Sequence, residues 1–214
     1  MIKLGLKTYL PILHGPLEGL DYGAERPFIT WHKKDLNAAI QAWLALDPPR
    51  LELATLAFDE LNHRGKPGKA RASFEQAGLI PIDWLADARR ACKGVLPAPD
   101  GGSLKGKVYV VLRWGYVPEN GTYGAYVGST KKTIAKRFEE HRTSETGAKG
   151  LKKYGIEPLY SLFDGCNPFA GKVCLTRETA LHKALETVVP KVSGDVLKPQ
   201  AEDSAAPRMT ELDP

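Results

Sequence analysis

The sequence has few cysteines, no long apolar run and little net charge. Its three cysteines are an odd number at wide spacing, which argues against a disulfide framework and indicates a reducing compartment. No apolar run approaches the roughly 18–20 residues of a bilayer-spanning helix. The stretch MIKLGLKTYLPILHG also lacks a small-residue cleavage site, so we expect no signal peptide, no membrane association and a cytoplasmic protein. The net charge of +5 only weakly indicates an anionic partner.

That small net charge is unevenly distributed along the 214 residues. Residues 1–100 contain 13 basic and 12 acidic side chains, residues 101–192 contain 15 and 8, and residues 193–214 contain 2 and 5. The positive excess therefore lies in the middle segment, where a polyanion would bind. A merely solvated surface is the alternative, because Lys and Arg are mostly exposed in any soluble protein.

The first 95 residues have the pattern of a small helical domain for targeting or partner binding. Leu36, Ile40 and Leu44 recur at the spacing of one helical face, and the Asp-Pro-Pro sequence that follows ends that helix. We expect Trp31, Trp43 and Trp84 to belong to the core rather than to stack on bases. Helices are expected over residues 32–46, 51–61 and 81–91, with a basic loop broken by Gly and Pro at 63–71.

After a Pro- and Gly-rich linker at residues 96–104, the hydrophobic period changes from that of helices to that of strands. The segments KVYVVLR and YGAYVGS alternate with period two and flank an Asn-Gly turn, which predicts an antiparallel hairpin. The tail at 193–214 is polar and acidic, and we expect it to be disordered. The expected elements are strands at 107–113, 123–129 and 158–164, a helix capped by Ser129 or Thr130 and running to 142, and a helix at 176–189.

Several side chains that can perform chemistry gather in this second half. Alternation along the two strands places Tyr109 and Tyr126 on one face, which the flanking glycines leave open to something large. Arg137 and His141 are spaced i, i+4, so they project from one side of the expected helix. Glu178, in the first turn of the last helix, is the carboxylate best placed to join them.

The order of these residues resembles the GIY-YIG nuclease family. Lys107-Val108-Tyr109 and Tyr126-Val127-Gly128 stand in the places of the two name-giving motifs, and YVGSTKKTIAKRFEEHR is the most specific stretch. The resemblance covers about residues 105–192 and says nothing of residues 1–95. It implies an α+β fold, with a small antiparallel sheet flanked by helices and preceded by the helical domain.

The resemblance also implies a DNA endonuclease that hydrolyses phosphodiester bonds with one Mg²⁺ or Mn²⁺ per active site. Glu178 would be the metal ligand and Arg137 would hold the scissile phosphate with its guanidinium fork. Either Tyr109 or Tyr126 would orient or deprotonate the attacking water, and His141 would relay a proton or contact phosphate. The basic side chains expected to contact DNA are Lys131, Lys132, Lys136 and Arg142.

Two departures from the family pattern leave alternatives open. Glu186 is a second carboxylate on the helix of Glu178, and Ser193 stands where the family usually has an Asn. The missing Asn favours an alternative function, a nuclease-derived module that binds DNA without cutting it. A restriction, mobile-element or toxin role is open, and in a toxin residues 1–95 would bind a protein such as an immunity protein. One active site per chain means that a double-strand cut needs a homodimer or two successive nicks.

Two further groups of residues have competing interpretations. Cys166, Cys174 and His182 have the spacing C-x7-C-x7-H, which lacks a close cysteine pair and a fourth ligand, so a zinc site is disfavoured. The cations in the basic loop could contact phosphate or simply be solvated. These cations are Lys66, Lys69 and Arg71.

Overall fold

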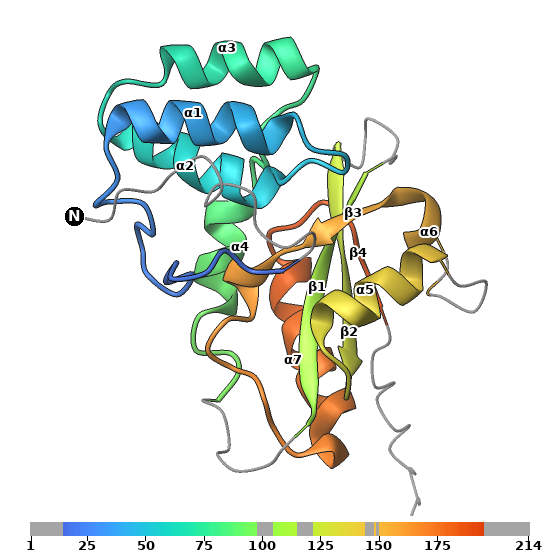
Figure 1. Ribbon diagram of the computed structural model, residues 1–214. Coiled ribbons are helices and arrows are strands. Elements are labelled where there is room, and N and C mark those ends of the chain that lie inside the picture. The colour runs from blue at the N-terminus through green and yellow to red at the C-terminus, as the bar shows by residue number, and fades with distance from the viewer. Residues whose placement is uncertain (1–14, 98–104, 115–121, 144–147, 149, 195–214) are drawn as a thin grey trace, which may run out of the picture.

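The computed structural model describes residues 15–97, 105–114, 122–143, 148 and 150–194. These residues form an α+β fold in which helices surround a four-stranded sheet, as expected from the sequence (Figure 1). No helix in these ranges is long and apolar enough to cross a membrane. The α-helices are α1 (Lys33–Leu44), α2 (Leu51–His63), α3 (Gly68–Ala77), α4 (Leu85–Cys92), α5 (Ile134–Thr143), α6 (Leu151–Tyr154) and α7 (Cys174–Glu186). The strands are β1 (Lys107–Trp114), β2 (Tyr123–Thr130), β3 (Gly155–Pro158) and β4 (Val192–Ser193), and two 3₁₀ turns are η3 (Tyr160–Leu162) and η4 (Gly171–Val173).

Helices α1, α2 and α3 pack on one another in the N-terminal half. The first two confirm the helices expected at 32–46 and 51–61, and Trp43 on α1 is fully buried. The loop expected at 63–71 is wrong from Gly68 onward, because α3 begins there. Pro67 precedes the first turn of α3, where its missing N–H costs no hydrogen bond. Phe74 and Ala70 supply the buried side of that helix.

The sheet has the strand order β3-β1-β2-β4. Strand β1 pairs antiparallel with β2 and with β3, as expected. Strand β4 runs parallel to β2, so the sheet is mixed rather than wholly antiparallel. Parallel pairing needs a crossover connection, and α7, which packs on β1, β2 and β4, lies in that connection. In Figure 1, α7 lies behind β1 and β2, whereas α5 lies in front of them.

The third strand is shorter than expected and lies earlier in the chain. It ends at Pro158, and the residues expected to continue it form η3 instead. The buried Glu52 carboxylate on α2 accepts hydrogen bonds from the backbone N–H of Tyr160 at 2.9 Å and of Ser161 at 2.7 Å. These two amides therefore bond to a side chain rather than to a neighbouring strand.

The helical half and the sheet share one hydrophobic core. Arg50 precedes α2 and donates from Nε to Glu157 Oε2 on β3 at 2.8 Å, with both side chains fully buried. Trp84 Nε1 donates to the Tyr123 carbonyl at 3.2 Å, which ties the start of α4 to β2. The division into two domains at 96–104 stays a prediction, since most of that linker lies outside the described residues. Most of the tail expected at 193–214 also lies outside the described residues, although Ser193 belongs to β4.

Candidate active site

Tyr109 and Tyr126 lie side by side on one face of the sheet, as predicted. The register pairs Tyr109 with Gly128 and Val111 with Tyr126, so the two tyrosines project to the same side of neighbouring strands. Their ring centroids are 6.3 Å apart. Tyr109 is buried, whereas Tyr126 is partly exposed, so one phenol is enclosed and the other can reach solvent.

Gly128 makes room for both rings. A Cβ atom at this position would lie 2.6 Å from Cζ and Oη of Tyr109 and 2.9 Å from Cε1 of Tyr126. Real Cβ atoms do not approach other atoms so closely. The glycines on this face were expected to leave space for a large ligand; at Gly128 the tyrosine rings themselves occupy that space.

Helix α5 brings two further candidates to this face. It begins after Thr133, whose hydroxyl accepts the Lys136 N–H at 3.3 Å and whose carbonyl accepts the Arg137 N–H at 3.0 Å. The cap expected at Ser129 or Thr130 is therefore wrong. Both residues belong to β2, and the Thr130 hydroxyl accepts the Lys132 N–H instead, at 3.1 Å. Helix α5 packs on β1 and β3, with His141 turned toward the tyrosines.

His141 is hydrogen-bonded through both ring nitrogens. Nε2 lies 2.7 Å from the Tyr109 hydroxyl, and Nδ1 accepts the Ala148 backbone N–H at 2.9 Å. Burial, together with the nearby Arg137 charge, lowers the His141 pKa to about 4, so the ring is neutral near pH 7. Because Nδ1 is an acceptor, the single ring proton resides on Nε2 and is donated to Tyr109. The Tyr109 hydroxyl proton is therefore directed to another partner.

Arg137 adds positive charge beside the same phenol. Its guanidinium is about one-third exposed, and Nη1 contacts Glu140 Oε2 at a long 3.4 Å. Burial raises the pKa of Tyr109 above its ordinary range, as do the charges of Tyr126 and Glu178, whereas the hydrogen bonding and charge of Arg137 lower it. Burial is the largest of these influences; the Arg137 guanidinium opposes it, and the Glu178 carboxylate adds a smaller effect in the same direction as burial.

Glu178 supplies that carboxylate from α7. It is 5% exposed and lies in the second turn, because α7 begins at Cys174 rather than at residue 176. The expectation of a first-turn position is therefore wrong. The alternative, Glu186, is eight residues or about 12 Å further along the helix. Its side chain is 57% exposed and lies 3.5 Å from His182 Nδ1, so Glu178 is the carboxylate associated with Tyr109.

The oxygen atoms at this site fit a hard divalent cation. The Glu178 carboxylate and the Tyr109 phenol offer the donors that Mg²⁺ and Mn²⁺ prefer, and such ions complete their coordination with water and phosphate oxygens. In the part of the chain that the structure describes, no three His, Cys, Asp or Glu side chains form a metal-binding group. Cys166, Cys174 and His182 are among the residues that are not grouped in this way.

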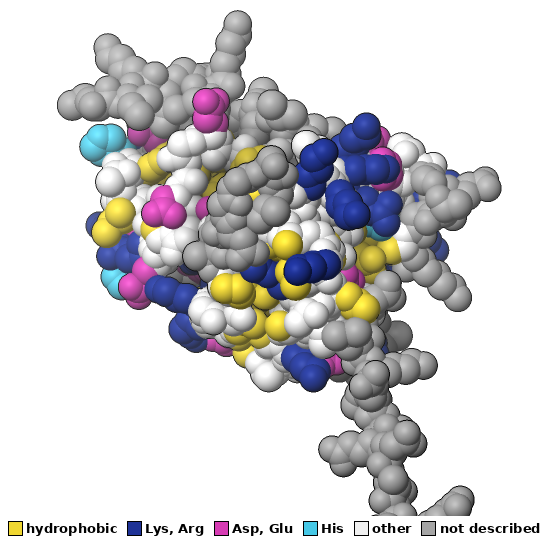
Figure 2. Space-filling view, turned by 90° about the horizontal axis from the view of Figure 1, so that it is seen from below, with side chains coloured by type: hydrophobic (Ala, Val, Ile, Leu, Met, Phe, Trp, Pro, Cys, Tyr) yellow, Lys and Arg dark blue, Asp and Glu magenta, His cyan; other side chains and the backbone are white. Residues whose placement is uncertain are grey.

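Exposed basic side chains lie on α5 and on the segment just before it. Figure 2 shows Lys and Arg side chains gathered on one part of the face seen from below. Lys132 contacts the Glu140 carboxylate at 2.5 Å, which places it beside Arg137. Of the candidate DNA contacts, Lys131, Lys132 and Lys136 are exposed and Arg142 is partly exposed.

Asn167 and Ser193 position the strands around the site. Asn167 Nδ2 donates to the Val108 carbonyl and its Oδ1 accepts the Val108 N–H, both at 2.9 Å, which fixes the strand beside Tyr109. The sequence around Asn167 indicates only a turn, and it does not predict a hydrogen-bond partner 59 residues away.

Ser193 Oγ accepts a hydrogen bond from Arg113 Nη1 at 2.8 Å and donates one to the Ala125 carbonyl at 3.3 Å. This side chain therefore ties β4 to the sheet.

The chain matches no protein-family model, no curated protein and no solved structure. The resemblance to the GIY-YIG nucleases therefore depends on the residues and spacings of this chain alone.

Proposed function

We propose that the protein is a divalent-cation-dependent endonuclease of the GIY-YIG type that hydrolyses DNA phosphodiester bonds. The observation that carries this proposal is the buried hydrogen bond between Tyr109 and His141, with Arg137 and Glu178 acting on the same phenol. A tyrosine that only packs in a core needs one hydrogen-bond partner for its hydroxyl, and water can be that partner. Here α5 brings a neutral imidazole to 2.7 Å from the hydroxyl, and the charges of Arg137 and, less strongly, of Glu178 act on it. This arrangement is suited to proton transfer beside an anion.

Arg137 is suited to hold the scissile phosphate. Its contact with Glu140 is long and partly exposed, and such an ion pair contributes little to stability. A phosphate oxygen can therefore replace the Glu140 carboxylate at small cost. Two parallel N–H···O bonds from the guanidinium would fix the orientation of the phosphate.

Tyr109 is the better candidate of the two tyrosines for the general base. His141 donates to its oxygen, and Arg137 favours its phenolate form. In that form the oxygen keeps the hydrogen bond from His141 and accepts a proton from the attacking water. Glu178 would hold the cation, whose positive charge would lower the pKa of the Tyr109 phenol and stabilise the developing charge on the phosphate. Burial alone keeps Tyr109 protonated, so cleavage should require the cation.

The experiment is nicking of a supercoiled plasmid in the presence of Mg²⁺ or Mn²⁺. Wild-type protein should nick the plasmid, Arg137→Ala should not, and the exposed Arg90→Ala on α4 should behave as wild type. Equal nicking by wild type and Arg137→Ala, or none by any of the three, would refute the proposal.

Ser193 favours a second candidate, a DNA-binding module without cleavage. It stands where the family usually has an Asn, and its hydroxyl is engaged by Arg113 and the Ala125 carbonyl. Salt-sensitive DNA binding with no nicking under any divalent cation would select this candidate.

A further inference from the structure

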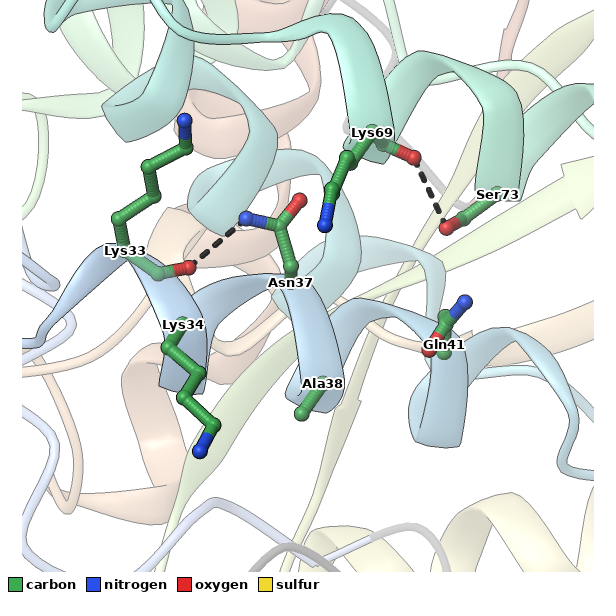
Figure 3. Close-up of a pocket in the computed structure, with 7 residues that line it drawn as sticks. All are labelled: Lys33, Lys34, Asn37, Ala38, Gln41, Lys69 and Ser73. Atoms are coloured by element: carbon green, nitrogen blue, oxygen red, sulfur yellow. Dashed lines mark hydrogen bonds between the residues drawn. The ribbon is translucent and has the colours of Figure 1, made fainter.

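A groove lies between α1 and α3, on the helical half of the molecule (Figure 3). Its volume is about 420 Å³. In Figure 1 these helices lie at the top, whereas β1 begins, two residues before Tyr109, at the lower end of the sheet. The groove is therefore separate from the candidate active site. Its polar lining residues are Lys33, Lys34, Asn37, Gln41, Lys69 and Ser73.

The lining of this groove carries positive charges and no negative charges. Lys33, Lys34 and Lys69 are all exposed, and no Asp or Glu lines the groove. Within the described ranges, none of the three lysines forms an ion pair. Residues 1–100 carry a net charge of only +1. The three lysines are therefore a local concentration of positive charge, and this half of the chain is not basic in general.

Neutral polar groups complete the groove without neutralising it. Asn37 donates from Nδ2 to the Lys33 carbonyl at 2.8 Å, and its Oδ1 is buried without a hydrogen-bond partner. Ser73 donates to the Lys69 carbonyl at 3.1 Å. Both side chains are thus held by the backbone of their own helices. The three ammonium groups remain for an external anion.

We propose that the α1–α3 groove binds the phosphate backbone of DNA at a second point, away from the cleaved bond. The inference rests on the proposed function, because it gives the helical half a role in holding the same duplex. Lysines act as point charges on phosphates and need no particular base sequence. The groove also contains no aromatic side chain, whereas protein interfaces are enriched in aromatics and depleted in Lys. Duplex DNA therefore fits it better than a protein partner does.

The test compares Lys34→Gln/Lys69→Gln with a control of equal charge in the same half of the chain, Arg90→Gln/Lys93→Gln. Binding to a fluorescent duplex of about 30 base pairs, roughly 100 Å long, is measured by anisotropy over a range of salt concentrations. The groove variant should lower the slope of log K against log salt by about 1.8 and weaken binding about tenfold at low salt. The control should match wild type. All four substituted side chains are exposed, and a thermal melt verifies folding.

The outcomes separate this inference from the proposed function. If the groove variant binds with the slope and affinity of the control, the inference is refuted whether or not the protein cleaves DNA. If the slope falls as expected but no variant cleaves, the groove is supported and the nuclease is not. If the variant loses affinity for duplex RNA and not for DNA, the stated occupant is wrong. Failure of wild type to bind DNA refutes both.

Discussion

The Tyr109 hydroxyl and the His141 imidazole form a buried hydrogen bond of 2.7 Å that joins strand β1 to helix α5. The Ala148 N–H binds the other ring nitrogen and so fixes the orientation of the imidazole. His141 is therefore the donor and Tyr109 the acceptor, which leaves the Tyr109 proton available to a third group. This relationship makes the pair suited to proton transfer as well as to packing.

Removing either member of this pair should slow the same step of cleavage. We expect His141→Phe to lower the single-turnover cleavage rate by about 100-fold, in the range of general acid–base effects. Tyr109→Phe should lower it as much, and the double variant no further, because the two groups act as one unit. Tyr123→Phe is the control, since it loses only its bond to the Ile80 carbonyl. Additive losses in the double variant would contradict a coupled pair.

A methyl group at Gly128 should disturb both tyrosines. The new Cβ would clash with the rings of Tyr109 and Tyr126, so Gly128→Ala should destabilise the fold by about 1–3 kcal/mol and impair cleavage. The matched control is Gly68→Ala at the start of α3, where a Cβ meets nothing within 4 Å. Urea denaturation measures both variants. A Gly128→Ala protein as stable and active as the control would show that the rings have room to move.

The hairpin and the facing of its tyrosines could be predicted because both depend on local pattern. Alternation along KVYVVLR and YGAYVGS sets which side chains share a face, and the structure confirms it. Arg137 and His141 likewise follow from helical spacing. The alternation does not reveal that the space above Gly128 is filled, because the two rings that fill it come from separate strands.

The features that the sequence did not predict depend on distant partners. Glu52 redirects the amides of Tyr160 and Ser161 from more than 100 positions away, so the third strand ends early. The parallel pairing of β4 follows from the path of the chain after α7, which no local pattern specifies. Helix α3 has too few apolar residues for its periodicity to stand out, with Ala70 and Phe74 as its buried apolar side chains.

The His141 pKa gives a pH dependence of stability with a definite sign. Its folded-state value of about 4 is below its ordinary 6.5, so between these values the unfolded chain binds a proton that the folded chain does not. The stabilisation from neutral His141 is therefore complete above about pH 6.5 and is lost as the pH falls toward 4. The stability difference between wild type and His141→Phe should shrink by roughly 2 kcal/mol over that window.

Denaturation of both proteins at several pH values measures this difference. The difference between the two proteins isolates His141, because other groups also change the stability with pH. Burial raises the pKa of Asp59 to about 6 and that of Glu52 to about 8, and these two groups make the folded state less stable, not more stable, as the pH rises. The exposed His32→Phe should keep the wild-type profile. A difference between wild type and His141→Phe that stays constant from pH 6.5 to 4 would contradict a buried neutral imidazole.

The buried pair of Arg50 and Glu157 should couple the helical half to the sheet. Arg50→Met leaves the fully buried Glu157 carboxylate without its cationic partner, which typically costs about 3–5 kcal/mol. Circular dichroism and tryptophan fluorescence should then follow one transition at lower denaturant. Arg90→Met is the control, because it breaks only an exposed pair with Asp87 and should change stability by less than about 1 kcal/mol. A sheet that unfolds at the wild-type midpoint would show two independent units.

The central claim is that Glu178 and its neighbours form a cation-dependent nuclease site, and single-turnover cleavage of a labelled duplex with Mg²⁺ tests it most directly. Glu178→Gln is compared with Glu186→Gln, which makes the same chemical change at an exposed position of the same helix. Glu178→Gln should lose roughly 100-fold or more in rate, Glu186→Gln should cleave as wild type does, and EDTA should stop all cleavage. Equal rates for the two variants, or wild-type cleavage that persists in EDTA, would contradict the account.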